Sequence, residues 1–106
     1  MSDFKIISVS ELPTLLAKGK VRLIDVRTDA ETARGIIAGA TKLPLHLLPM
    51  RLAELDTQQT HVFYCQLGGR SAQAAAFAVN QGLTDVYNLQ GGITAWMQAG
   101  QPVSAG

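Results

Sequence analysis

An alternation of short apolar runs with segments of helical pattern is the feature that most limits how this chain can fold. The expected strands are residues 21–26, 41–45, 61–65 and 85–89, and the expected helices lie at 10–20, 28–35, the end of 45–55, 71–82 and 93–100. Strands joined by helices pair in parallel through right-handed crossovers. The order therefore predicts an α/β fold with a mainly parallel sheet and helices on both faces. Pro44 places the run at 41–45 near a sheet edge.

Length and composition limit the number of domains and the kinds of partner. A chain of 106 residues, 47% of them hydrophobic, is expected to form one domain over residues 1–106. The 9 basic and 8 acidic residues leave a net charge of +1, which offers little to a nucleic acid or an anionic membrane. The N-terminus lacks a signal-peptide pattern, and no window approaches the roughly 18 apolar residues of a membrane span. We therefore expect a soluble, cytoplasmic protein.

The thiol and imidazole groups are few. The chain has 1 cysteine and 2 histidines. A single cysteine cannot form an internal disulfide. One cysteine and two histidines are also too few for the usual set of metal ligands. We therefore expect no metal site.

The cysteine, Cys65, stands where strand 61–65 ends and a glycine-containing loop leads into a helix. In a parallel sheet, sites lie beyond the carboxyl ends of the strands. Arg27 follows strand 21–26 and is therefore expected at the same edge as Cys65. The residues of the loop are Gln66, Leu67, Gly68, Gly69 and Arg70, and Ser71 opens the helix.

A loop of this kind favours a negative charge. Gly68 and Gly69 let the backbone turn several N–H groups toward one point, and the start of the helix adds a positive potential. With Arg70 nearby, these donors should lower the pKa of Cys65. We predict that Cys65 is a nucleophile at neutral pH, that the backbone of residues 66–71 cradles its charge, and that Arg70 stabilises a bound anion.

Structural explanations stand beside these functional ones. A free cysteine is often simply buried, and Arg70 could be a surface cation at a helix start. Ser71 could be an N-cap, a donor to the sulfur, or both. Arg27 could form only a structural ion pair with Asp25, in which case it would be no part of a site.

Two other enzyme classes place a cysteine in comparable surroundings. A Cys-His hydrolase needs a histidine beside the thiol, but His61 precedes Cys65 by four residues, roughly 13 Å along a strand. His46 is expected in a partly exposed loop. Cysteine phosphatases and arsenate reductases use a C-x5-R spacing, whereas four residues separate Cys65 from Arg70. The shorter loop should enclose a space better suited to a terminal sulfur than to a phosphate.

Three stretches resemble the rhodanese, or sulfurtransferase, family in the correct order. Residues 65–71 resemble its active-site loop, and residues 25–44 resemble its D-V-R-x-x-x-E-[YF]-x-x-G-H-I-x-G-A-x-x-x-P stretch. Residues 87–103 resemble its closing G-G-x-x-x-W-x-x-x-G-x-P-V. The resemblance covers nearly the whole chain, and it implies a rhodanese-like three-layer fold with a mainly parallel sheet of about five strands.

The resemblance also implies the chemistry. Members of the family move a sulfane sulfur from a donor such as thiosulfate to a thiophilic acceptor such as cyanide or a thiol, through a cysteine persulfide. For this chain it implies a persulfide on Cys65, substrate contacts from the loop and Arg27, and no cofactor. The implied partners are small sulfur compounds or a protein that donates or accepts sulfur. The alternative from another class is a persulfide carrier or a partner-docking module.

Two positions depart from the family pattern, and the closing motif has a structural interpretation. Ile36 stands where the family usually has histidine, and Thr32 stands where an aromatic residue usually follows the glutamate. Both departures lie outside the thiol loop and are expected to affect substrate preference rather than the cysteine chemistry. Gly91, Gly92 and Trp96 are interpreted as a turn and a core aromatic residue, which identify the fold rather than the chemistry.

Overall fold

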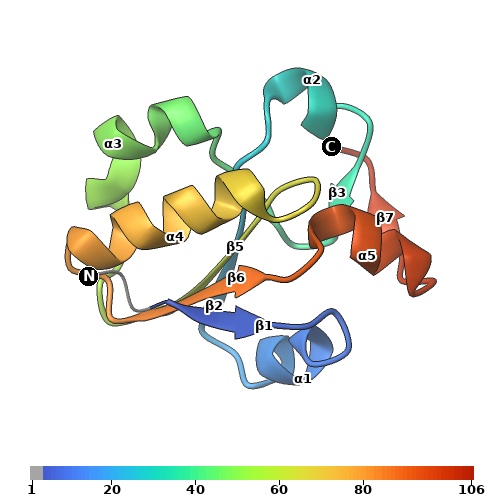
Figure 1. Cartoon of the computed structure of the whole chain (residues 1–106), viewed down its shortest axis with the longest axis horizontal. Helices are drawn as coiled ribbons and strands as arrows, with labels where there is room; N and C mark the ends of the chain where they lie inside the picture. The colour runs from blue at the N-terminus through green and yellow to red at the C-terminus, as the bar shows by residue number, and fades with distance from the viewer. Residues whose placement is uncertain (1–3) are drawn as a thin grey trace.

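The computed structural model describes residues 4–106, which form a central sheet between layers of helices (Figure 1). Five strands pair in the order β1-β6-β5-β2-β4, and every pairing is parallel. They are β1 (Lys5–Ile7), β2 (Val21–Asp25), β4 (Thr41–Lys42), β5 (Thr60–Tyr64) and β6 (Asp85–Leu89). A separate antiparallel pair joins β3 (Ile36–Ile37) to β7 (Val103–Ser104). The predicted α/β class and five-stranded parallel sheet are confirmed.

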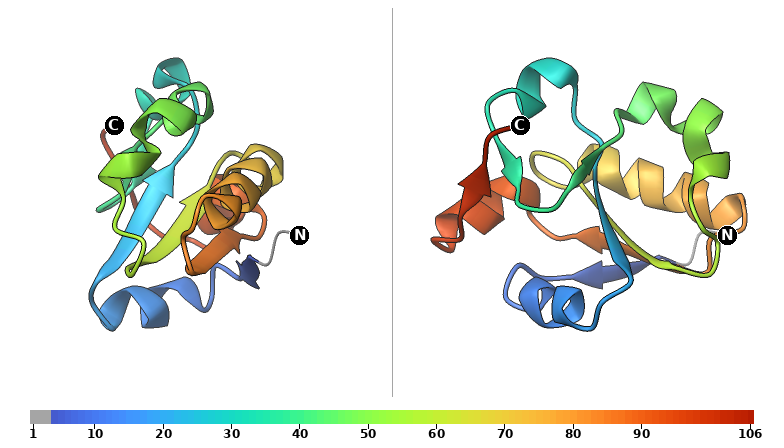
Figure 2. Two further views of the ribbon diagram at one scale, coloured as in Figure 1. Left: turned by 90° about the vertical axis from the view of Figure 1, so that its left-hand side faces the viewer. Right: turned by 180° about the vertical axis from the view of Figure 1, so that it is seen from behind.

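Helices lie against both faces of the sheet (Figure 2). They are α1 (Leu12–Ala17), α2 (Asp29–Thr32), α3 (Leu48–Arg51), α4 (Gly69–Asn80) and α5 (Gly92–Gln98), with the 3-10 turns η1 (Leu45–Leu47) and η2 (Leu52–Glu54). Helices α3 and α4 pack over a core that contains Ile24 and Phe63. Helices α1 and α5 pack over a second core that contains Leu23 and Val62. The three expected layers are therefore present.

The alternation of side chains along β5 decides where the thiol points. Val62 and Tyr64 belong to the core beneath α1 and α5, whereas Phe63 and Cys65 belong to the core beneath α4. Successive side chains of a strand face opposite sides of a sheet. Cys65 therefore lies on the side of the sheet where α4 begins.

Several segments differ from the sequence-based expectations. Strand β1 was not among the expected strands, because three residues are too few to show a periodic pattern. The expected strand 41–45 shortens to β4, since the chain turns into η1 after Pro44. Helix α4 begins at Gly69, two residues before the expected start at Ser71. The remaining strand predictions agree with β2, β5 and β6 to within one residue.

Residues 4–106 contain neither a metal-binding cluster nor a membrane-spanning helix. No three side chains of His, Cys, Asp or Glu gather within this range so that they could hold a metal ion. Helix α4 has 12 residues, and no helix of this part of the chain has the length and apolarity to cross a bilayer.

His61 is buried without a full set of hydrogen-bond partners. Its Nδ1 atom lies 3.0 Å from the carbonyl oxygen of Gln59, and its Nε2 atom has no partner among the described residues. Burial lowers the pKa of His61 below its ordinary 6.5, because a charged imidazole would lose its hydration here. The residue lies at the start of β5, whereas Cys65 follows its end, so His61 cannot serve the thiol as a base.

The buried His61 predicts an acid-sensitive stability. Since its folded-state pKa lies below the unfolded value of about 6.5, the unfolded chain binds the proton first, and stability falls as the pH drops below about 6.5. We expect the free energy of unfolding to decrease between pH 7 and pH 5 by up to about 1.4 kcal/mol per pH unit from this group. In His61→Leu the contribution of this group to the pH dependence of the free energy of unfolding should vanish. Urea unfolding at each pH measures it.

The exposed His46 provides the matched control for this prediction. His46→Leu should keep the slope of the parent between pH 7 and pH 5. If His61→Leu and His46→Leu change the slope equally, the buried imidazole is not the group responsible.

Candidate active site

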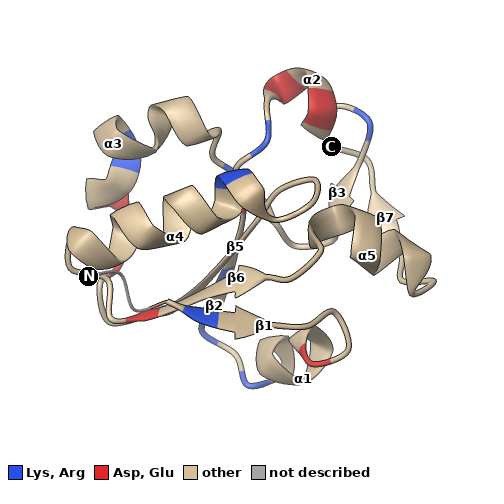
Figure 3. Cartoon of the chain, in the orientation of Figure 1, with Lys and Arg blue, Asp and Glu red and all other residues tan. Residues whose placement is uncertain are grey.

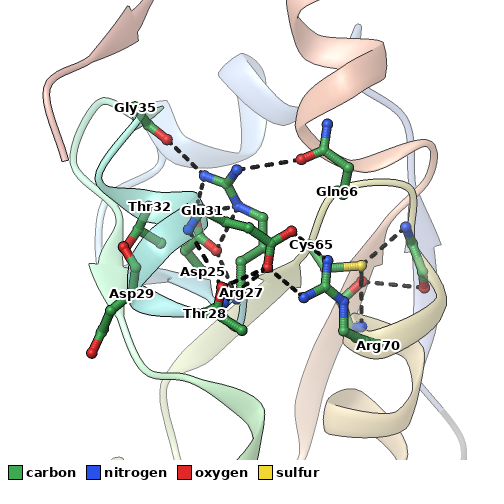
Figure 4. Close-up of polar contacts among 12 residues, drawn as sticks. Asp25, Arg27, Thr28, Asp29, Glu31, Thr32, Gly35, Cys65, Gln66 and Arg70 are labelled. Carbon is green, nitrogen blue, oxygen red and sulfur yellow. Dashed lines mark hydrogen bonds and ion pairs between the residues drawn. The ribbon is translucent and has the colours of Figure 1, made fainter.

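Cys65 lies in a cradle of hydrogen-bond donors at the carboxyl end of β5 (Figure 4). Its Sγ atom accepts hydrogen bonds from the backbone N–H of Gly68 at 3.1 Å and from that of Ser71 at 3.4 Å. The hydroxyl oxygen of Ser71 also lies 3.4 Å from the sulfur. The side chain of Cys65 is buried, with 2% of the residue exposed. Of the loop amides expected around the sulfur, those of Gly68 and Ser71 therefore contact it.

Gly68 allows the loop to turn into helix α4. Its φ angle of +121° is one that residues with a side chain rarely adopt, and it is the N-cap residue of α4. The carbonyl oxygen of Gly68 accepts the first helical hydrogen bond, from Ala72 at 3.1 Å. Ser71 is thus in the first turn of the helix and is not its N-cap. Of the two roles considered for Ser71, the N-cap is wrong, and the proximity to the sulfur is observed.

The donors around the sulfur shift its protonation. Burial by itself would raise the pKa of Cys65, because it disfavours the charged thiolate. The hydroxyl and amide of Ser71 and the amides of Gly68 and Leu67 outweigh this effect and bring the pKa below its ordinary value. A larger share of the thiol is therefore ionised at neutral pH than in a free cysteine.

The start of helix α5 holds the loop in place. The N–H of Ile93 donates to the carbonyl of Cys65 at 2.9 Å, and the N–H of Thr94 donates to the carbonyl of Gln66 at 3.2 Å. Gly92 lies so close that a Cβ on it would overlap both carbonyl groups, and its φ is +59°. The interpretation of Gly92 as a turn residue is therefore incomplete, because it also lets α5 approach the loop that carries the nucleophile.

Arg70 is held by a carboxylate outside the loop. Its two terminal nitrogens donate to the two carboxylate oxygens of Glu31 at 2.6 and 2.8 Å. This contact lowers the pKa of Glu31 to about 2 and raises that of Arg70. Glu31 also caps α2 in a reciprocal pair with Thr28. The arginine therefore links the start of α4 to α2, and its charge still interacts with that of Cys65.

Arg27 forms the structural ion pair considered from the sequence, and it also reaches the loop. Its guanidinium donates to both carboxylate oxygens of Asp25 and to the carbonyl oxygen of Gly35 at 2.6 Å. Both partners of the ion pair are buried, with exposed side-chain fractions of 5% and 0%. A third contact, at 3.4 Å, joins Arg27 to the side-chain oxygen of Gln66. The pair is structural, yet it lies beside the residue next to the nucleophile.

The remaining loop residues point in different directions. The side-chain nitrogen of Gln66 donates to the hydroxyl of Thr94 at 2.7 Å, so its amide bridges α5 and Arg27. The side chain of Leu67 is 68% exposed at the tip of the loop. A Cβ on Gly69 would meet no atom within 4 Å. The loop thus combines a fixed interior with an open, apolar tip.

A pocket of about 250 Å³ opens next to this network. It is lined by Arg27, Arg34, Gly35, Gln66, Ile93, Met97 and Val103. Figure 3 shows that acidic residues gather on α2 rather than on α5, which forms one wall of this pocket. The lining therefore contains two arginines and no carboxylate.

Asn88 on β6 is the polar neighbour of the site that the sequence analysis missed. Its side-chain oxygen accepts from the hydroxyl of Ser71 at 2.5 Å, and its side-chain nitrogen donates to the carbonyl of Gly68 at 3.2 Å. Asn88 is 6% exposed. A single amide side chain near the end of a buried apolar strand was the available signal, since buried polar groups need partners.

Comparison with known proteins identifies relatives along most of the chain. The rhodanese-like domain model matches residues 8–99. A sulfurtransferase of Allochromatium vinosum is 47% identical over 85 residues, which are 80% of this chain and 79% of that protein. Thiosulfate sulfurtransferase GlpE of Stutzerimonas stutzeri is 36% identical over 96 residues, 91% of this chain and 87% of that protein. The crystal structure of a rhodanese-related protein from Thermoplasma volcanium has a TM-score of 0.89 at 27% identity and covers 97% of this chain and 100% of its own.

The close approach of α5 predicts that Gly92→Ala disrupts the cradle. The new Cβ would collide with the carbonyls of Cys65 and Gln66 in a backbone conformation unsuited to alanine. Clash and strain should each cost about 1–3 kcal/mol in the free energy of unfolding. Alkylation of Cys65 by iodoacetamide at pH 7 should slow toward the rate of an ordinary cysteine, because the amides no longer converge on the sulfur.

Gly100→Ala is the matched control, since Gly100 has a φ of +78° but open space around the new Cβ. It should lose stability through backbone strain alone and keep the alkylation rate of the parent. An unchanged alkylation rate in folded Gly92→Ala would mean that α5 does not orient the loop.

Proposed function

The chain belongs to the rhodanese-like domain family, and we propose that it is a thiosulfate-type sulfurtransferase that carries sulfur as a persulfide on Cys65. The observation that carries the proposal is the convergence of the Gly68 and Ser71 amides on a thiol of lowered pKa. Such a cradle favours the thiolate, which is the form of cysteine that attacks sulfur. The named sulfurtransferases among its relatives support transfer of sulfur as the general activity.

The first half of the reaction loads the cysteine. The thiolate of Cys65 attacks the outer sulfur of thiosulfate and forms a new S–S bond, while the S–S bond of thiosulfate breaks and its electron pair leaves with sulfite. The negative charge then rests on the outer sulfur of the persulfide. We expect the donors that stabilise the thiolate to stabilise this anion as well, since they converge on a small volume around Sγ.

The second half returns the cysteine to its starting state. A thiophilic acceptor such as cyanide or a thiolate attacks the outer sulfur, and the Cys65 thiolate leaves with the electron pair of the S–S bond. No group from outside the chain is needed except donor and acceptor. The pocket beside Gln66 has Arg34 and the Asp25-paired Arg27 in its wall, but its lining does not include Cys65, so the proposal does not depend on it.

A second candidate function is a persulfide carrier that exchanges sulfur with a protein. The observation that favours it is the exposure of Leu67, an apolar side chain at the tip of the loop, two residues from the nucleophile. Contact of a protein partner with this tip would bring its thiol close to Cys65. Both functions use the same persulfide, so they differ in the donor and acceptor rather than in the chemistry.

The contacts of Arg70 predict a role in binding the anionic donor. Glu31 takes one N–H from each terminal nitrogen of Arg70, which leaves further N–H groups for an anion. Arg70→Ala should lower kcat/KM for thiosulfate by roughly one to two decades, since a charge-assisted hydrogen bond contributes about 1.5–3 kcal/mol. The measurement is steady-state thiocyanate formation with thermal unfolding recorded in parallel.

Arg51 offers the matched control, because it also pairs with a glutamate, Glu54, but lies on α3. Arg51→Ala should leave kcat/KM unchanged. Activity of Arg70→Ala within a factor of two of the parent, with unchanged melting, would remove Arg70 from the mechanism.

The decisive experiment for the proposed function is detection of the persulfide. Incubation with thiosulfate alone should add the mass of one sulfur atom to the intact protein, because the first half-reaction needs no acceptor. Cyanide should then remove that mass and release thiocyanate. Since the chain has 1 cysteine, Cys65→Ser should show neither event. Steady-state kinetics should show the parallel double-reciprocal lines of a double displacement.

Two results would contradict this function. If thiosulfate and a set of other sulfane donors leave the mass of the folded, reduced protein unchanged, the persulfide mechanism is wrong. If the protein instead hydrolyses an aryl phosphate in a manner that depends on Cys65, the phosphatase alternative is favoured.

A further inference from the structure

The hydroxyl of Ser71 has one proton and three possible acceptors. The side-chain oxygen of Asn88 lies 2.5 Å from the Ser71 oxygen, the carbonyl oxygen of Gly68 lies at 3.2 Å, and the sulfur of Cys65 lies at 3.4 Å. A hydroxyl donates only one hydrogen at a time. Judged by distance, Asn88 is the favoured acceptor. The sulfur and Asn88 therefore compete for the same proton.

The orientation of the Asn88 amide is fixed by Gly68. The carbonyl of Gly68 can only accept, and it lies 3.2 Å from the side-chain nitrogen of Asn88. The opposite orientation would bring two oxygens together and turn the amide N–H groups toward Ser71. The side-chain oxygen of Asn88 must therefore face the Ser71 hydroxyl. Asn88 is almost fully buried, so no bulk water replaces the serine if it turns away.

The competition depends on the state of the sulfur. While Cys65 carries its proton, the S–H can donate to the Ser71 oxygen, and the Ser71 hydroxyl donates to Asn88. When the sulfur is a thiolate, the Ser71 hydroxyl gains by turning to it, but the Asn88 oxygen then loses its donor. Apart from the thiol proton, which leaves, only the hydroxyl hydrogen moves between these two arrangements, and no heavy atom needs to shift.

We propose that Asn88 is a positioning residue that holds the Ser71 proton while Sγ is uncharged and competes with Sγ for this proton when it is a thiolate. Sγ is uncharged in the thiol, and it is again uncharged in a persulfide, whose charge lies on the outer sulfur. The persulfide part of this inference rests on the proposed function. The competition in the free protein depends only on the observed contacts.

The competition limits how strongly the thiolate is stabilised. A thiolate with very strong donors becomes a weaker nucleophile, because intrinsic nucleophilicity falls as the basicity of the sulfur falls. The amides of Gly68 and Ser71 donate in every state, whereas the Ser71 hydroxyl is shared. Asn88 thereby keeps the sulfur basic enough to attack while the two amides keep it ionised.

The charged groups near the sulfur are already paired with one another. Arg70 on α4 pairs with Glu31 on α2, and Arg27 pairs with Asp25 at the end of β2. Helix α5 contains no charged residue, and Asp85, the one on β6, lies at the opposite end of that strand from Asn88. Replacement of Asn88 by a neutral residue leaves these pairs intact, but it also removes the hydrogen bond to the Gly68 carbonyl. Comparison with the Ser71→Ala background separates the effect of the Ser71 hydroxyl from that loss.

The test is the pH profile of iodoacetamide alkylation of the single cysteine in the parent, Asn88→Ala, Ser71→Ala and the double variant. Asn88→Ala frees the Ser71 hydroxyl for the thiolate, so alkylation near pH 6 should be roughly threefold or more faster than in the parent. At high pH, where every thiol is ionised, the same variant should be slower. The two profiles should therefore cross. In the Ser71→Ala background, loss of Asn88 should have no effect.

If Asn88→Ala only loosened the packing around the cradle, alkylation near pH 6 would be slower than in the parent instead of faster. If Asn88→Ala in a native fold alkylates no faster than the parent near pH 6, or if the effect persists without Ser71, the proposal is wrong. Should Asn88→Ala fail to fold, the neutral Asn88→Leu keeps the branching of the parent side chain, offers no acceptor to Ser71 and allows the same test. Its alkylation near pH 6 should also be faster than that of the parent, and the gain should vanish with Ser71→Ala; a gain that persists there, or its absence in a native fold, would overturn the proposal.

This readout is independent of sulfur transfer. Alkylation needs no sulfur donor, so the crossing profiles are expected even if thiosulfate adds no mass to the protein. Conversely, if the protein forms the persulfide but the pH profiles of the parent and Asn88→Ala do not cross, the proposed function stands and the proposed role of Asn88 is wrong.

Discussion

The two hydrogen bonds from the start of α5 to the loop are the contacts on which the site depends. Ile93 and Thr94 bind the carbonyl groups of Cys65 and Gln66. The C=O and N–H of a peptide unit point in opposite directions, so the carbonyls held toward α5 turn the amides of Gln66 and Leu67 away from it, and the Leu67 amide is one of the donors that lower the pKa of Cys65. Gly92 permits this approach because it has no side chain. Residues more than 25 positions after the cysteine in the sequence thus help to set the chemistry of the thiol.

The charges of the site are balanced in pairs, and this assigns most of the anion stabilisation to the backbone. Asp25 accompanies Arg27, and Glu31 accompanies Arg70. Removal of one partner from the buried pair of Arg27 would leave an uncompensated charge, which is costly in an apolar interior. The pairs therefore fix the positions of β2, α2 and α4 around the loop. The amide donors, which carry no counter-charge, remain available to the sulfur.

The sequence was sufficient for the features that depend on local pattern. The alternation of apolar runs and helical segments predicted the parallel sheet, and the position of Cys65 after a buried strand predicted its place at the sheet edge. The glycines of the loop predicted the cluster of amides. These predictions succeeded because each rests on residues close together in the chain, whose backbone geometry is decided locally.

The contacts between segments far apart in the chain could not be predicted from local sequence pattern. The pairing of Arg70 with Glu31 spans 39 residues, and the contact of Ser71 with Asn88 spans 17 and joins a helix to a strand. Their partners are set by the packing of whole elements, which no local pattern records. Of the two roles left open for Ser71, the N-cap is excluded for a related reason, since Gly68 is the N-cap and the helix begins earlier than the polar residue suggests.

A cradle made of backbone amides suits a reaction in which the charge moves by one atom. In the thiolate the charge lies on Sγ, and in a persulfide it lies on the next sulfur, about 2 Å further out. A lone cation placed for one position would be misplaced for the other, whereas several N–H groups that converge on a small volume can stabilise both. The side chains that adjust between the two states can then be few. In this chain the Ser71 hydroxyl is the group in the cradle that can change its partner without moving a heavy atom.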